Sequence, residues 1–253
     1  MSNLDLFSGK DKAEIAIERL QTFCPPEGYY VAFSGGKDSV VILDLVKRSG
    51  VKFDAHYNIT GIDPPELFYF IRDNFPEVER HRPETTIWKL IEKKGFPPTR
   101  MIRYCCEFLK ERGGTDRFIV TGVRWAESSR RSKRRIVEAC FRDSRKHYVN
   151  PIIDWLDADI WQYIHKYNIP YCGLYDEGFK RLGCIGCPMG SNQKAELERW
   201  PKYKKLYITA FKRAIAAYPG RCTIATNENE MYNWFIRQTR TPKGDPDQTV
   251  MFE

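Results

Sequence analysis

The 253-residue sequence has no apolar run that approaches the ~20 residues of a membrane-spanning helix. Its first residues also lack the basic and then apolar pattern of a signal peptide. Internal repeats and low-complexity segments are absent as well, which excludes the repeat architectures. These absences predict a cytoplasmic protein with no membrane partner.

The composition is that of a globular protein with a real core, because 42% of the residues are hydrophobic. The length suits one large domain, or a domain with a small appendage. The sequence contains eight cysteines. In a reducing compartment, cysteines favour metal binding or catalysis over disulfides.

One short segment carries the strongest chemical signal. It follows the apolar run 29–31, precedes the helical run 40–46, and reads Ser34-Gly35-Gly36-Lys37-Asp38-Ser39. The two glycines allow the backbone to approach an anion closely, and the helix that follows presents free N–H groups and a positive dipole end. A Walker A loop is excluded, because the glycines are adjacent and Asp38 follows the lysine. A phosphate-binding loop is favoured over a plain turn before a helix.

Strand-like and helix-like segments alternate along most of the chain. The strands are predicted at 29–33, 52–60, 78–82, 117–124 and 148–153, and the helices at 11–23, 38–48, 65–74, 86–94, 101–112 and 157–166. This alternation predicts a doubly wound α/β fold with a mainly parallel, five-stranded sheet. Ligand-binding residues are then expected at the carboxyl ends of the strands. The pattern becomes mostly helical after about residue 170, so we predict domains at 1–170 and 171–253.

Four cysteines occur as two pairs, Cys105-Cys106 and the C-x-x-C of Cys184 and Cys187. Adjacent cysteines are hard to place on one tetrahedral zinc ion, whereas a cluster offers a separate iron to each. The pattern therefore favours a [4Fe–4S] cluster, with zinc and reduced or redox-active thiols as alternatives. The other cysteines are interpreted as small buried residues, with the role of Cys172 left open: Cys24, Cys140, Cys172 and Cys222.

Positive charge is concentrated in one segment. The net charge is +8, and residues 124–146 hold nine Lys or Arg against three acids. Such a segment is either a solvated surface or nucleotide clamp, or a track for a polyanion such as DNA.

Taken together, these motifs resemble the phosphoadenosine phosphosulfate reductase family of the PP-loop ATP pyrophosphatase superfamily, which has a Rossmann-like fold. The likeness covers about residues 29–190. Beyond the loop, it includes Thr60-Gly61 with Pro65-Glu66, Gly122-Val123-Arg124 with Arg130, and the segment from Asn150 to Trp155. The resemblance implies that an adenine nucleotide is bound by Ser34, Gly35, Gly36, Lys37, Asp38, Ser39, Thr60, Gly61, Gly122 and Arg124. It implies catalytic roles for Lys37, Asp38, Arg124 and Arg130.

One departure from the family pattern decides the predicted reaction. The family's reductases use a nucleophilic cysteine in a C-terminal Glu-Cys-Gly-Leu-His motif, and this sequence has no cysteine after Cys222. The chain then looks closest to the branch that converts ATP to AMP and pyrophosphate during DNA phosphorothioation (Dnd and Ssp systems). That resemblance implies ATP, Mg²⁺ and the cluster as cofactors, DNA bound by residues 124–146, and a cysteine desulfurase as sulfur donor, and it leaves a homodimer open.

Three alternatives stay open. The first is an adenylyl sulfate or phosphoadenylyl sulfate reductase, and the second is a tRNA thiolase with the same ATP chemistry. The third is a cluster-bearing nucleic-acid-binding protein that only senses nucleotide.

Overall fold

The computed structural model describes residues 10–140, 143–218 and 225–237. The described chain forms two compact units. The first unit contains Met1–Ile59, Pro64–Arg82 and Arg112–Gly183, and the second contains Thr60–Asp63, Pro83–Glu111 and Cys184–Glu253. Cys222 and the C-terminal tail lie outside the described residues.

The first unit is built on a sheet of six strands in the order β3-β2-β1-β4-β6-β5. The strands are β1 (Tyr29–Ala32), β2 (Phe53–Asn58), β3 (Glu79–His81), β4 (Phe118–Val120), β5 (Val137–Ala139) and β6 (His147–Val149). All pairs are parallel except β5 with β6. The doubly wound α/β fold and its five parallel strands are thus confirmed. The predicted strand count is wrong by one, because the short antiparallel β5 lies in the basic segment.

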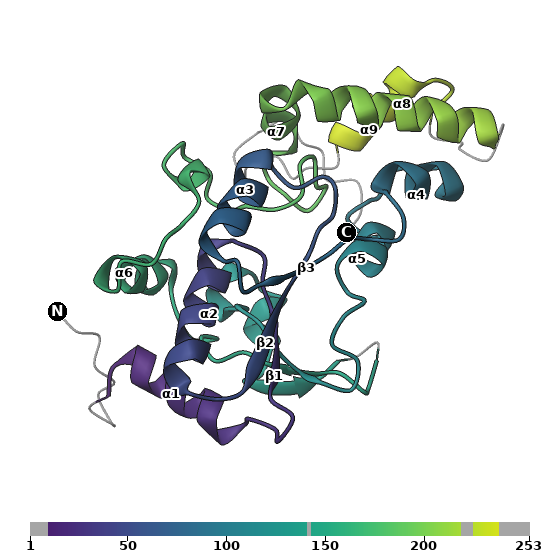
Figure 1. Cartoon of the computed structure of the whole chain (residues 1–253). Helices are drawn as coiled ribbons and strands as arrows, with labels where there is room; N and C mark the ends of the chain where they lie inside the picture. The colour runs from purple at the N-terminus through teal and green to yellow at the C-terminus, as the bar shows by residue number, and fades with distance from the viewer. Residues whose placement is uncertain (1–9, 141–142, 219–224, 238–253) are drawn as a thin grey trace. The chain divides into compact units, whose positions relative to one another are not determined.

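Helices of the first unit start and end where local signals predict. They are α1 (Lys12–Thr22), α2 (Lys37–Ser49), α3 (Pro65–Asn74) and α6 (Asp157–Lys166). Asp11 and Glu14 form a capping box at the start of α1, and α2 ends at Gly50 in the left-handed conformation. Helices α1 and α6 both pack against α2, and Figure 1 shows the three side by side. Helix α2 is the most deeply buried of them, as its apolar residues between positions 40 and 46 require.

The second unit is helical. It contains α4 (Ile87–Lys94), α5 (Tyr104–Leu109), α7 (Gln193–Arg199), α8 (Pro201–Ala217) and α9 (Glu228–Ile236). Helix α8 packs against α4, α7 and α9, as seen in Figure 1. The core of the second unit is aromatic. The ring centroids of Tyr207, Phe211 and Phe235 lie 5.1–5.9 Å apart, and the three side chains are almost fully buried.

The compact units do not follow the predicted division at residue 170. Residues 60–63 and 83–111 group with the C-terminal helices, although they precede that position in the chain. The boundary between residues 170 and 171 stays a prediction. None of the helices in the described part of the chain combines the length and hydrophobicity needed to cross a bilayer.

Candidate functional site

The loop 34–39 lies at the point where the strand order of the sheet reverses. Strand β1 has β2 on one side and β4 on the other, so the chain moves to one edge through β2 and β3 and then crosses to the other side of β1 at β4. Ligands of open α/β sheets bind at such a point, outside the carboxyl ends of the strands. The loop connects the end of β1 to the start of α2 and is therefore positioned for binding.

Four charged side chains form a network at this loop. The ammonium of Lys37 lies 3.1 Å from Asp157 Oδ1 and 3.6 Å from Asp38 Oδ2. Arg124 donates from Nε to Asp38 Oδ1 at 2.7 Å and from Nη2 to Asp157 Oδ1 at 3.1 Å. Lys37 and Arg124 are buried, whereas the side chain of Asp157 is 62% exposed. Two cations are thus held in place by carboxylates, one of which faces solvent.

Asp157 and Tyr175 are site residues that the sequence analysis missed. Asp157 is the first residue of α6, the helix that follows β6. Its position after a strand could therefore have predicted a place at the carboxyl edge of the sheet. Tyr175 gave no such signal, because it lies in a short 3₁₀ turn (Gly173–Tyr175) that no regular sequence pattern marks. Its hydroxyl accepts a hydrogen bond from the Lys37 backbone N–H at 2.8 Å, and burial raises the pKa of the phenol. The hydroxyl occupies the place where an anion would meet the first N–H group of α2.

The remaining loop residues hold the turn together. The Ser39 hydroxyl donates to the Gly36 carbonyl oxygen at 2.8 Å and lies 3.2 Å from the Ser34 hydroxyl. Gly122, just after β4, packs against the start of α2, since a Cβ there would lie 3.0 Å from the Asp38 Cβ. A larger residue at position 122 would push the loop away from the sheet.

Gly35 is required for two separate reasons. Its φ is +70°, and a Cβ at this position would lie 2.6 Å from the buried side chain of Ile71 on α3. We expect Gly35→Ala to lower the free energy of unfolding by about 2–5 kcal/mol, from backbone strain and overpacking together. Denaturant unfolding measures the change.

Gly50→Ala is the matched control for this substitution. Gly50 has the same φ of +70°, but no atom lies within 4 Å of an added Cβ. It should therefore show the strain alone, about 1–2 kcal/mol. Equal losses for the two variants would contradict the packing role of Gly35.

Thr60 and Gly61, predicted to bind nucleotide, belong to the second unit. Thr60 is buried, and its backbone N–H donates to Asp63 Oδ2 at 2.8 Å. Its hydroxyl lies 3.7 Å from Cys184 Sγ, and the Ile185 N–H donates to the Ile62 carbonyl at 2.7 Å. This turn therefore supports the C-x-x-C segment, a role that sequence spacing did not reveal. Nucleotide binding by Thr60 and Gly61 stays a prediction.

The structure brings the two cysteine pairs together within the second unit. A hydrogen bond to Cys106, burial and the charges of Cys106, Cys184 and Cys187 raise the pKa of the Cys105 thiol. The same hydrogen bond lowers the pKa of Cys106 to about 6, which favours a thiolate at neutral pH. Burial raises the pKa of Cys184 to about 11, against the opposing charge of Lys110.

This group of four thiols has the chemistry of a metal centre. Gly186 has φ +71° and forms the tight turn between Cys184 and Cys187. Zinc–sulfur bonds of 2.3 Å in a tetrahedron would place the sulfur atoms about 3.8 Å apart. In the part of the chain that the structure describes, no three cysteine sulfur atoms lie within 4.8 Å of one another. Metal binding by these four cysteines stays a prediction.

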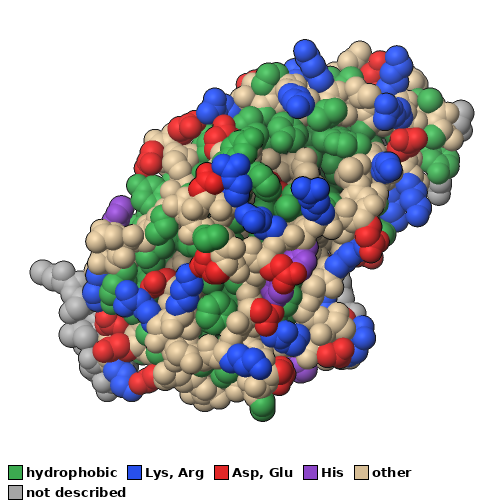
Figure 2. Space-filling view, viewed as in Figure 1, with side chains coloured by type: hydrophobic (Ala, Val, Ile, Leu, Met, Phe, Trp, Pro, Cys, Tyr) green, Lys and Arg blue, Asp and Glu red, His purple; other side chains and the backbone are tan. Residues whose placement is uncertain are grey.

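The basic segment 124–146 is only partly available to a partner. Arg131 pairs with Glu127, Arg134 with Glu138, and Arg145 with Asp143. Arg124 is buried in the loop network, whereas Arg130 is exposed. On the face drawn in Figure 2, Lys and Arg side chains are interspersed with Asp and Glu. Roles for Arg130 and for a nucleic-acid partner stay predictions.

Residues 28–189 match the model of the phosphoadenosine phosphosulfate reductase domain family. The chain belongs to this family, which confirms the resemblance seen in its motifs. It is 31% identical over 187 residues to the adenosine 5'-phosphosulfate reductase of Geobacillus kaustophilus, covering 67% of this chain and 77% of that protein. It is also 31% identical over 199 residues to the uncharacterized protein MJ0066 of Methanocaldococcus jannaschii, covering 70% of this chain. The chain spans only 40% of the length of MJ0066.

A solved structure supports the same fold. The crystal structure of phosphoadenylyl-sulfate reductase from Candida auris, a phosphate complex, superposes with a TM-score of 0.52 at 19% identity. The match covers 71% of this chain and 90% of that one. The family and the fold are thereby established, and neither comparison supports the DNA phosphorothioation branch over the rest of the family.

Proposed function

We propose that the loop 34–39 binds the phosphate of an adenine nucleotide, and that the nucleotide is an adenylyl sulfate that the enzyme reduces to sulfite and AMP. The observation that carries the proposal is the pair of buried cations, Lys37 and Arg124, held at the carboxyl edge of the sheet. Membership of the reductase domain family and the likeness to adenosine 5'-phosphosulfate reductases support the substrate class.

The charges of the network explain how a nucleotide would bind. Lys37, Arg124, Asp38 and Asp157 together carry two positive and two negative charges. Asp157 is the exposed member, so an arriving phosphate can displace it from Lys37 at little desolvation cost. Asp38 is less exposed and holds the Arg124 guanidinium in place through the hydrogen bond from Arg124 Nε. A phosphate bound here gains charge-assisted hydrogen bonds from both cations.

The chemistry requires a good leaving group. One thiolate of a dithiol reductant such as thioredoxin attacks the sulfonyl sulfur, a sulfur–sulfur bond forms, and the bond from sulfur to the phosphate oxygen breaks with its electron pair leaving on AMP. The second thiol of the reductant then attacks the first thiol's sulfur, releases sulfite and forms a disulfide, so the dithiol supplies the two electrons. Lys37 and Arg124 would stabilise the charge that develops on the phosphate of AMP.

The four cysteines of the second unit fit a [4Fe–4S] cluster, which Cys105, Cys106, Cys184 and Cys187 would hold through their thiolates. When bound, such a cluster would supply a charged centre that changes the electrostatic field around it. The pKa of Cys106 is lowered to about 6, which favours its thiolate, whereas the pKa values of Cys105 and Cys184 are raised, so iron would have to displace their protons on binding.

Cleavage of ATP to AMP and pyrophosphate is the second candidate, as part of sulfur insertion into a nucleic acid. One observation favours it: the 253 residues contain no Glu-Cys-Gly-Leu-His motif to supply the attacking thiolate. In the first unit, burial raises the pKa of Cys172, which makes it a poor nucleophile. This candidate would use ATP with Mg²⁺, a sulfur donor such as a cysteine desulfurase, and a DNA or tRNA acceptor.

Product analysis separates the two candidates. Anaerobically purified protein is mixed with adenylyl sulfate and thioredoxin, or with ATP, Mg²⁺ and nucleic acid. We expect sulfite and AMP from the first mixture and little pyrophosphate from the second. Release of pyrophosphate without sulfite would favour the second candidate over the first. If folded protein forms neither sulfite nor pyrophosphate, both candidates are contradicted.

A further inference from the structure

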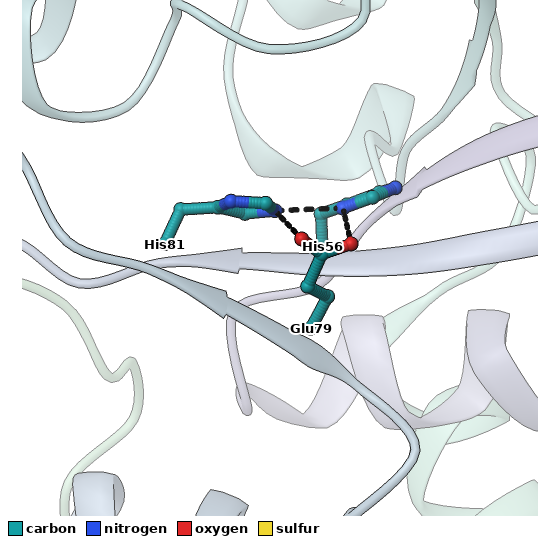
Figure 3. Close-up of side chains that lie close together, drawn as sticks. All are labelled: His56, Glu79 and His81. Atoms are coloured by element: carbon teal, nitrogen blue, oxygen red, sulfur yellow. Dashed lines mark hydrogen bonds and ion pairs between the residues drawn. The ribbon is translucent and has the colours of Figure 1, made fainter.

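We propose that His56, Glu79 and His81 form a binding site for a divalent transition-metal ion such as zinc. The three side chains come from β2 and the neighbouring edge strand β3 and converge on one point, as Figure 3 shows. His56 lies directly opposite Glu79 in the strand register, and His81 lies opposite Asn58. Side chains two residues apart on one strand share a face, so Glu79 and His81 both reach His56.

The separations of the ligand atoms suit one ion. His56 Nδ1 lies 2.8 Å from His81 Nε2 and 3.5 Å from a Glu79 oxygen, and His81 Nε2 lies 3.7 Å from the other Glu79 oxygen. Metal–ligand bonds of 2.0–2.1 Å in a tetrahedron place ligand atoms about 3.3 Å apart. The three observed distances bracket this value, so small side-chain rotations are enough to hold the ion.

The surroundings of His56 prepare its Nδ1 atom for coordination. Its Nε2–H donates to Asp54, and Asp54 is in turn paired with Arg117 at 2.5 Å. A proton on Nε2 leaves the Nδ1 lone pair directed at His81 and Glu79. The ring of Tyr30 stacks on the imidazole, with centroids 4.1 Å apart and planes 8° from parallel. A carboxylate behind a metal-binding histidine and a fixed ring are what such sites require.

The donor set selects the kind of ion. Two imidazole nitrogens and one carboxylate are typical ligands of zinc and of other first-row transition metals, whereas Mg²⁺ and Ca²⁺ prefer oxygen alone. Side chains of His81 and Glu79 are 39% and 65% exposed, so an ion can enter from solvent and keep water as a further ligand. Bound there, it would tie β3, a strand of three residues, to β2.

Cobalt titration tests the site, because Co²⁺ bound by histidine and carboxylate has a different absorption spectrum from Co²⁺ bound by cysteine thiolates. The full chain, stripped of metal under anaerobic conditions, is titrated with Co²⁺ and compared with His81→Ala and Glu79→Gln. We expect the unaltered chain to bind one more equivalent than either variant, without the intense near-ultraviolet thiolate charge-transfer band. Zinc should displace that cobalt and raise the melting temperature of the unaltered chain by several degrees.

His165→Ala is the matched control, because this exposed histidine lies on α6 outside the group. It should bind cobalt like the unaltered chain. Glu79 is largely exposed, so Glu79→Gln serves if His81→Ala does not fold. Equal cobalt stoichiometry in the unaltered chain and the folded variants, or a thiolate band on the additional equivalent, would overturn the proposal. Both readouts are independent of nucleotide turnover.

Discussion

Replacing Lys37 by methionine is expected to lower the kcat/KM for the nucleotide by about 100-fold or more, with the fold kept. The ammonium is buried between Asp38 and Asp157 at the start of α2, where it would meet the phosphate. Removal of one donor that stabilises developing charge typically costs 10²–10³-fold in rate. Methionine retains the unbranched stem, so the packing around it is largely conserved. Turnover and nucleotide affinity are measured side by side.

The control for Lys37 is a lysine on the same helix. Lys47 lies in the last turn of α2, pairs with Glu77 and is exposed. Lys47→Met changes the net charge equally but lies away from the loop, so its activity should stay within about twofold of the unaltered chain, as for exposed ion pairs. Full activity in Lys37→Met would show that the loop is not the phosphate site.

The second large effect is expected on iron binding and thermal stability when both cysteines of the C-x-x-C pair are replaced. We expect Cys184→Ser with Cys187→Ser to abolish iron binding and to lower the melting temperature by more than about 5 °C, since the proposed cluster would stabilise the fold. Cys184 contacts Thr60, and the adjoining Ile185 bonds to Ile62, so the site joins three segments of the second unit. Iron, acid-labile sulfide and visible absorption are measured on anaerobically purified protein.

Cys24→Ser is the matched control for the double variant. Cys24 lies in the first unit, and its thiol contacts the Pro25 carbonyl. It should keep the full iron content and a melting temperature within a few degrees. One zinc and no iron in the unaltered chain would refute the proposed cluster. Iron retained by the double variant would refute the assignment of Cys184 and Cys187 as its ligands.

The central strands β1 and β4 could be predicted because burial on both faces leaves near-continuous apolar runs. Strand β1 is such a run, and the loop after it carries a specific motif. Strand β5 could not be predicted in the same way. It has only three residues, lies at the antiparallel edge and occurs within a charged segment, where no periodic pattern can develop.

The site itself was predicted in part. Lys37, Asp38 and Arg124 do lie together, because two strand ends meet at the point where the strand order reverses. The contact of Tyr175 with the Lys37 N–H joins residues 138 positions apart. No local pattern encodes such a contact, since it depends on where the 3₁₀ turn Gly173–Tyr175 lies relative to the loop.

The sequence by itself determined the family, the parallel α/β core, the place of the loop 34–39 between a strand and a helix, and the two cysteine pairs, because each is written in short-range patterns of residue type and spacing. Only the tertiary structure decided which charges neutralise one another at the loop and that Thr60 supports the C-x-x-C turn. It alone also brought His56, Glu79 and His81 together across two strands. The physical reason is that pairing of strands and packing of irregular segments join residues far apart in the chain, and those contacts have no local signature.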